Sequence, residues 1–219
     1  MSLSPSLKER VLAAAEKEPS PVRAQHRSKA LRSLAIATAI ALIVLFGTGG
    51  PEVGHRPNLL VVTTALILAG LAALVTWLAL RGFGKSMTGA PTEILVGAAV
   101  LSAPVAWMVE LGARVMWPPT YIHHASLLST SICHLCTLAM AAAPLVVFLR
   151  LRRGADPVHP RALGAALGAA AGMWGALLID LHCASNDLMH IAWGHALPTV
   201  VLVAIGAFFG SNSLRLRAA

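Results

Sequence analysis

Six long apolar segments alternate with short polar connections along the chain, after a polar start of 32 residues. The segments lie at about 33–50, 58–80, 93–116, 130–149, 162–181 and 191–210. Each is close to the ~20 residues with which an α-helix crosses a bilayer. The last segment differs from the others because it contains His195 and Pro198. The pattern predicts an all-α integral membrane protein with six transmembrane helices.

The polar start predicts a short helix of its own. Ser4 suits the N-cap and Pro5 the first helical position, and a proline-rich turn ends the helix beyond about Lys17. Leu7 and Val11 lie one turn apart on its apolar face. We therefore expect three parts: a soluble tail over residues 1–32, the transmembrane domain over 33–210, and a C-terminal tail over 211–219.

The composition excludes an ordinary soluble domain. Apolar residues make up 57% of the 219 residues and charged residues only 12%, with a mean hydropathy of +0.73. A soluble domain of this length carries roughly a quarter charged residues, so much of the apolar surface is expected to face lipid. No short apolar stretch with a cleavage site precedes the first long segment, and we expect no cleavable signal peptide.

The lysines and arginines predict how the helices are oriented. If the tail is cytoplasmic, 15 of the 17 basic residues lie in cytoplasmic segments, and only Arg56 and Arg114 lie outside. Cytoplasmic loops of membrane proteins carry this excess, so both termini are predicted to be cytoplasmic. The net charge of +8 then reflects topology and attraction to anionic lipids. We expect no direct binding of nucleic acid.

The same topology brings reactive side chains to the outer face. All three cysteines and seven of the nine histidines lie at or near it. Cys133 and Cys183 are at the outer ends of consecutive antiparallel helices, so the fold can bring them together. Cys136 follows Cys133 at a spacing that puts both sulfurs on one helix face. The polar stretch 181–196, LHCASNDLMHIAWGHA, is interpreted as an outer turn between the last two helices.

Three interpretations of the cysteines are open. Thiolates with nearby imidazoles suit zinc or copper(I), and His134, His190 and His195 are the candidate ligands. An outer pair can instead cycle between dithiol and disulfide. Buried cysteines also serve as small apolar residues.

Other features indicate packing more than chemistry. Glu110 and Arg114 are one turn apart and can pair with each other, and Asp180 ends the fifth segment. Glycines recur about every fourth residue in the fifth segment, which predicts close helix packing. No phosphate-binding loop, nucleophile elbow or zinc-protease motif is present. We expect no enzymatic activity and no cofactor.

An ordered series of motifs runs from Cys133 to Gly210. A cysteine heads the fourth helix, and Ala143-Pro144-Leu145 follows about three turns later. The basic loop LRLRRGADPVHPR, the glycine-rich fifth helix, the His182-Cys183 pair, Trp193 and a last helix with a Gly-x-x-x-Gly spacing complete the series. The tail segment LKERVL lies ahead of the first helix. In this order the motifs resemble the NrsF-type six-helix negative regulators of extracytoplasmic-function sigma factors.

The resemblance implies an anti-sigma factor of the bacterial inner membrane that regulates transcription under stress. Its tail would hold the sigma factor, and the cysteine pair, here Cys133 and Cys183, would sense the signal. Cys136 and His182 are added to the expected sensing residues. The expected partner-binding residues lie in the tail helix: Leu7, Arg10, Val11, Leu12 and Ala15. Two alternatives use Cys133, Cys136 and Cys183: a membrane thiol oxidoreductase, or a metal-binding membrane protein.

Overall fold

The computed structural model describes residues 23–51, 56–80, 91–116, 126–153, 159–183, 185 and 187–214, and these form helices with no strand. The chain divides into two compact units, Met1–Ser33 and Leu34–Ala219. The predicted tail helix lies outside the described residues, with the expected partner-binding residues Leu7, Arg10, Val11, Leu12 and Ala15, and so does most of the C-terminal tail.

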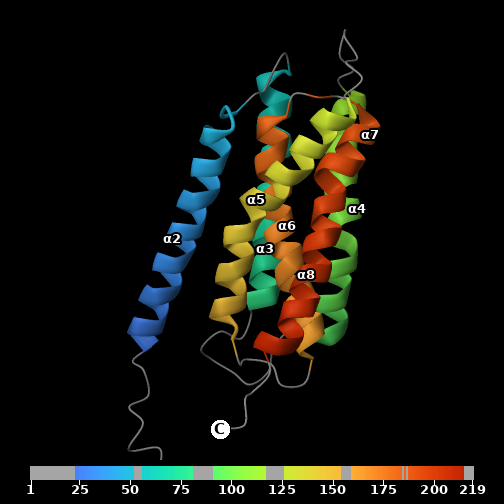
Figure 1. Cartoon of the computed structure of the whole chain (residues 1–219). Helices are drawn as coiled ribbons and strands as arrows, with labels where there is room; N and C mark the ends of the chain where they lie inside the picture. The colour runs from blue at the N-terminus through green and yellow to red at the C-terminus, as the bar shows by residue number, and fades with distance from the viewer. Residues whose placement is uncertain are drawn as a thin grey trace, which may run out of the picture. The chain divides into compact units, whose positions relative to one another are not determined.

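Six helical rods make up the described chain (Figure 1). The first five are α2 (Arg23–Gly47), α3 (Asn58–Leu80), α4 (Thr92–Met116), α5 (Leu127–Leu151) and α6 (Pro160–His182). The last rod runs without interruption through α7 (Leu188–Ile191), the π-helical turn η1 (Ala192–Ala196) and α8 (Leu197–Ser213).

Five of the six predicted spans are confirmed as helices long and apolar enough to cross a membrane: α3, α4, α5, α6 and the last rod. The apolar part of α2, Arg32–Gly47, is shorter than the ~20 residues of a full span. Helix α2 also begins ten residues before the predicted segment, at Arg23. Its first turns are rich in Arg, Lys, Ala and Gln, which favour helix in water as well as in lipid.

Helix α6 is the centre of the unit Leu34–Ala219. In its apolar stretch 78% of residues are buried, against 22–39% in the other four spans. It packs against α3, α4, α5 and α8, and Figure 1 shows it among these helices. The other helices expose large apolar side chains such as Leu66, Val100 and Phe208, as expected where a helix faces lipid.

Glycines bring α6 and α8 into backbone contact. A Cβ atom added at Gly164 would lie 2.2 Å from the carbonyl oxygen of Gly206, and one at Gly168 would lie 2.1 Å from that of Leu202. In lipid, helices associate by close packing and not by excluding water, and small residues permit it. The predicted tight packing of the glycine-rich helix is confirmed.

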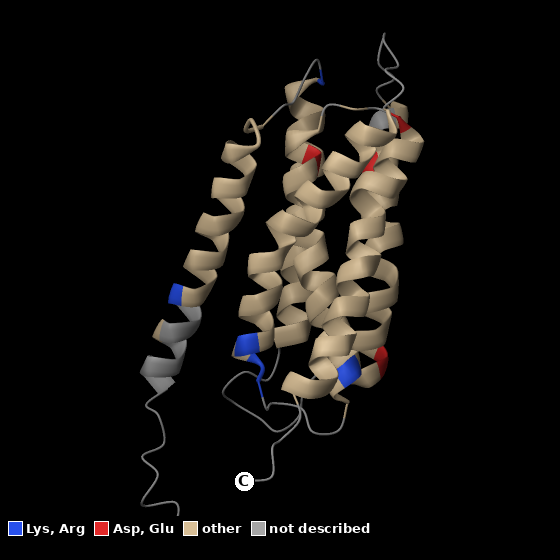
Figure 2. Ribbon diagram, in the orientation of Figure 1, with Lys and Arg blue, Asp and Glu red and all other residues tan. Residues whose placement is uncertain are grey.

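Charged residues separate towards the two ends of the bundle. Figure 2 shows basic residues gathered at one end of the described helices and acidic residues mainly at the other. Arg150 closes α5 and Arg161 opens α6 at the basic end. Arg56 lies before α3 at the acidic end, where it pairs with Asp180. The acidic end also holds the cysteines and histidines described next.

Candidate functional site

The predicted outer turn over residues 181–196 is wrong in its extent. Helix α6 continues to His182, and the connection ends at Asp187, after which the last rod begins. Asp187 starts this rod as its N-cap, because its carboxylate accepts a hydrogen bond from the backbone N–H of Met189 at 3.1 Å. The polar residues that suggest a loop are thus mostly helical, and His190 and His195 are buried.

The π-helical turn η1 aligns these two histidines. Residues five apart point about 140° apart around a regular α-helix, so His190 and His195 would face different sides. A π-helix instead stacks residues at that spacing, because its hydrogen bonds join residues i and i+5. The two rings lie edge to face with their centroids 5.4 Å apart. The π-turn therefore gives the site both imidazoles.

Side chains of α5 hold the π-turn in place. Thr137 Oγ1 donates to the carbonyl oxygen of Gly194 at 3.0 Å, and His134 Nδ1 donates to that of Trp193 at 2.9 Å. Gly194 lets η1 lie close to α5, since a Cβ atom at this position would lie only 3.3 Å from the Cβ atom of Cys133. The close contact sets Cys133 beside the two histidines.

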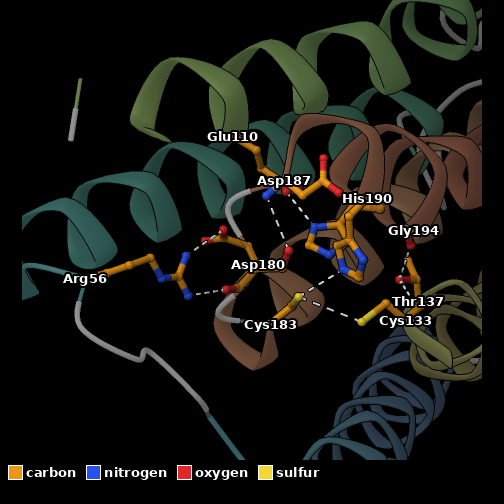
Figure 3. A network of polar contacts seen from close by, with 11 residues as sticks. Arg56, Glu110, Cys133, Thr137, Asp180, Cys183, Asp187, His190 and Gly194 are labelled. Carbon is orange, nitrogen blue, oxygen red and sulfur yellow. Dashed lines mark hydrogen bonds and ion pairs between the residues drawn. The ribbon is translucent and has the colours of Figure 1, made fainter. Parts of the chain in front are cut away.

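Two sulfurs and two imidazoles form one compact group at the acidic end (Figure 3). Cys133 and Cys183 are free thiols with their Sγ atoms 3.8 Å apart. The Sγ atom of Cys183 also lies 3.2 Å from His190 Nε2. The donor atoms of Cys133, Cys183, His190 and His195 all lie within 4.8 Å of one another. We call these four residues the Cys2His2 cluster.

Each imidazole of the cluster is oriented by a partner on its other nitrogen. His195 Nδ1 lies 2.7 Å from the Glu110 carboxylate of α4, and both side chains are almost fully buried. His190 Nδ1 lies 3.1 Å from the hydroxyl of Thr130 on α5. These contacts fix both rings so that their Nε2 atoms are left for the cluster. Helices α4 and α5 thus position donors carried by the last rod.

The environment of Cys183, just beyond the end of α6, favours its thiolate. A hydrogen bond with the Cys133 thiol lowers the pKa of Cys183, and the contact with His190 acts in the same direction against burial, which raises it. A thiolate is the form that attacks disulfides or binds metals.

Comparison with known proteins matches residues 12–216 to one family model, NrsF, described as negative regulator of sigma F. The match covers nearly the whole chain. The chain belongs to the NrsF family. The predicted resemblance is thereby confirmed, and the family is one of regulators of a sigma factor. No curated protein and no solved structure matches the chain.

The other predicted site residues of this NrsF-family chain lie outside the Cys2His2 cluster. Cys136 is half-buried on α5. His182 Nδ1 donates to the carbonyl oxygen of Gly50 at 2.8 Å, which links α6 to the turn after α2. His134 supports the backbone of η1. Cys133 and Cys183 are brought together, as their places at the ends of consecutive helices predict.

Sequence reasoning missed three partners of the site. Glu110 contacts His195, whereas the predicted partner Arg114 has a side chain outside the described part of the chain. Thr130 has no distinguishing pattern in the sequence. Arg56 pairs with Asp180 at 3.0 Å, although 124 residues separate them. The sequence signal for that pair is weak: Arg56 is one of two basic residues predicted for the outer face, and Asp180 ends an otherwise apolar segment.

Replacing Arg56 with methionine is expected to destabilise the bundle by about 3–5 kcal/mol, because a buried carboxylate at Asp180 loses its cation. The two side chains are 10% and 2% exposed, so water screens little of the pair. The double variant R56M/D180N should recover much of the loss, since neither half of this ion pair remains charged. Unfolding of the purified protein in a detergent titration measures the stability of both variants. An equal loss of stability in the single and the double variant would contradict the charge argument.

Proposed function

We propose that this NrsF-family protein is an anti-sigma factor of the bacterial inner membrane. It holds an extracytoplasmic-function sigma factor inactive through its N-terminal tail and releases it when Cys133 and Cys183 register a stress signal. The observation that carries the proposal is the family match over residues 12–216, which includes the tail from residue 12 onwards and all the helices that the structure describes.

The distribution of charge supports the orientation. Arg150, Arg152 and Arg161 lie at the connection between α5 and α6, and cytoplasmic connections are the ones that carry such residues. With this end in the cytoplasm and α2 counted as a sixth crossing, both termini are cytoplasmic and the Cys2His2 cluster faces the outer side. The tail is then on the same side as the transcription machinery, whereas the cysteines face the more oxidising compartment.

The tail supports binding of a protein partner. Its residues Leu7, Val11 and Ala15 recur at the spacing of one helix face, which suits a helix that lies in an apolar groove. Arg10 and the basic residues that follow suit an acidic sigma-factor surface. A sigma factor bound in this way is held at the membrane, away from polymerase.

The geometry of the two sulfurs supports sensing by a dithiol. At 3.8 Å, Cys133 and Cys183 need only small side-chain shifts to reach the ~2.05 Å of a disulfide. In forming the bond the two thiols lose two protons and two electrons, which reduce an oxidant of the peroxide class to water. A disulfide would pull α5 towards the end of α6, and α6 contacts four other spans. A shift of α6 would therefore change its packing against the other helices as far as the cytoplasmic end.

Deleting residues 1–20 is expected to abolish sigma-factor binding while the helices still assemble. Affinity purification of the full chain from bacterial membranes should recover a small sigma factor. The deletion variant should recover at least tenfold less, a loss of ~1.4 kcal/mol or more in binding. Removing residues 215–219 is the matched control, because it shortens the other terminus on the same side. If the full chain recovers no sigma factor, the proposal is wrong.

A further inference from the structure

We propose that the Cys2His2 cluster is a zinc site, with Cys133, Cys183, His190 and His195 as the four ligands. Two thiolates and two imidazoles in a compact group form the donor set of structural zinc sites. The site deepens the proposed function and rests on it for its regulatory meaning. The presence of the metal can nevertheless be measured without any sigma factor.

The distances suit a tetrahedral ion. Zinc bonds of ~2.3 Å to sulfur and ~2.05 Å to nitrogen place two sulfurs about 3.8 Å apart and a sulfur and a nitrogen about 3.6 Å apart. The two Sγ atoms are 3.8 Å apart, and Cys183 Sγ is 3.2 Å from His190 Nε2. The remaining donor pairs lie within 4.8 Å. Shifts of about 1 Å complete the tetrahedron.

The second ring nitrogen of His195 is available to bind a metal. His195 is fully buried and interacts with Cys183, and its Nε2 atom makes no close hydrogen bond within the described part of the chain. Leaving a buried polar atom unpaired costs free energy, so such an atom normally binds a partner. Because Nδ1 of the same ring contacts Glu110, Nε2 is the donor left for the cluster. A zinc ion there satisfies it.

The surroundings have the features of a metal centre beyond its direct ligands. Ligating histidines usually donate their other nitrogen to a carboxylate or another oxygen, which fixes the ring and makes it a better ligand. Glu110 does this for His195, and Thr130 for His190. Two thiolates balance the charge of Zn²⁺, which matters because Cys183, His190 and His195 are all buried.

Zinc would also define the resting state of the proposed sensor. The metal would join α5, the end of α6 and the last rod through four bonds. Each sulfur would be committed to zinc, so that Cys133 and Cys183 could not form a disulfide while the ion is bound. The zinc-loaded protein is then the reduced form, and loss of the ion is the step that frees both thiols.

Elemental analysis of the full chain, purified in detergent under reducing conditions, tests the site. We expect about one zinc per chain, as the four-ligand set requires, and loss of that zinc in Cys183→Ser and His195→Ala. Cys136→Ser is the matched control on α5, outside the cluster, and should keep the metal. Wild-type zinc content in Cys183→Ser or His195→Ala would overturn the site.

Two further measurements, cobalt loading and the milder variant Glu110→Gln, distinguish loss of the site from loss of folding. Wild-type protein stripped with a chelator and loaded with Co²⁺ should show the intense visible bands of a tetrahedral thiolate site. Glu110→Gln should still bind, with affinity lowered about 10–100-fold. No uptake of zinc or cobalt by folded wild-type protein, or copper alone in the purified protein, would refute a zinc site. Sigma-factor recovery from the same samples distinguishes the two proposals, because either can fail while the other holds.

Discussion

Replacing Gly168 with alanine is expected to destabilise the bundle by at least about 3 kcal/mol, at the upper end of what overpacking a core costs. The added Cβ atom would lie 2.1 Å from the carbonyl oxygen of Leu202 and 2.9 Å from the Cα atom of Val203. Both atoms belong to the backbone of α8, so no side-chain rotation can relieve the overlap. Helices α6 and α8 would have to move apart.

The effect should extend beyond one contact. Gly164 and Gly206 lie against each other along the same seam, with added Cβ atoms 2.2 and 2.3 Å from the facing carbonyl oxygens. Separating the two helices at Gly168 would loosen this contact too, and with it the buried face of α6. The last rod carries His190 and His195, so the Cys2His2 cluster would lose its geometry as well.

Gly97→Ala is the matched control. Gly97 lies inside α4, and a Cβ atom there would meet nothing within 4 Å. Alanine favours helix over glycine by about 0.5–1 kcal/mol, so this variant should be as stable as the wild type or slightly more stable. Thermal unfolding in detergent measures both variants. Equal melting temperatures for Gly168→Ala and Gly97→Ala would show that α6 and α8 do not pack through this seam.

Apolar length and small-residue spacing predict most of the fold. Helix α3 matches its predicted segment, 58–80, and α4 differs by one residue at its start. Apolar segments predict helices in a membrane protein because every backbone N–H and C=O group in the hydrocarbon needs a hydrogen bond within the chain. Helix propensity explains the error at α2: its basic first turns favour helix without being apolar. Apolar length therefore underestimates a helix that continues beyond the bilayer.

The candidate site was only partly predictable. Helix succession brings Cys133 and Cys183 to one end, and this follows from topology alone. The alignment of His190 with His195 does not, because it depends on a π-turn that local sequence does not reveal. Nor does the contact of Glu110 with His195, which depends on how α4 packs against the last rod. Contacts between helices distant in sequence are decided by packing, which periodicity does not report.

Replacing Cys183 with serine is expected to abolish the response to an oxidant while sigma-factor binding persists. Serine cannot form a disulfide, so oxidation no longer changes how α5 and the end of α6 are joined. The tail is at the other end of the chain in sequence and is unaltered, so it should still hold the sigma factor. A reporter fused to a sigma-dependent promoter measures the response, before and after exposure of cells to peroxide.

Cys136→Ser is the matched control for this experiment. It makes the same chemical change one turn along α5 from Cys133, but Cys136 is outside the Cys2His2 cluster. The reporter should respond to peroxide in Cys136→Ser as in the wild type, and Cys133→Ser should behave like Cys183→Ser. An unchanged response in Cys183→Ser would remove the cysteine pair from signalling. Equal loss in all three variants would instead indicate that any polar substitution in this region disturbs the packing of α5.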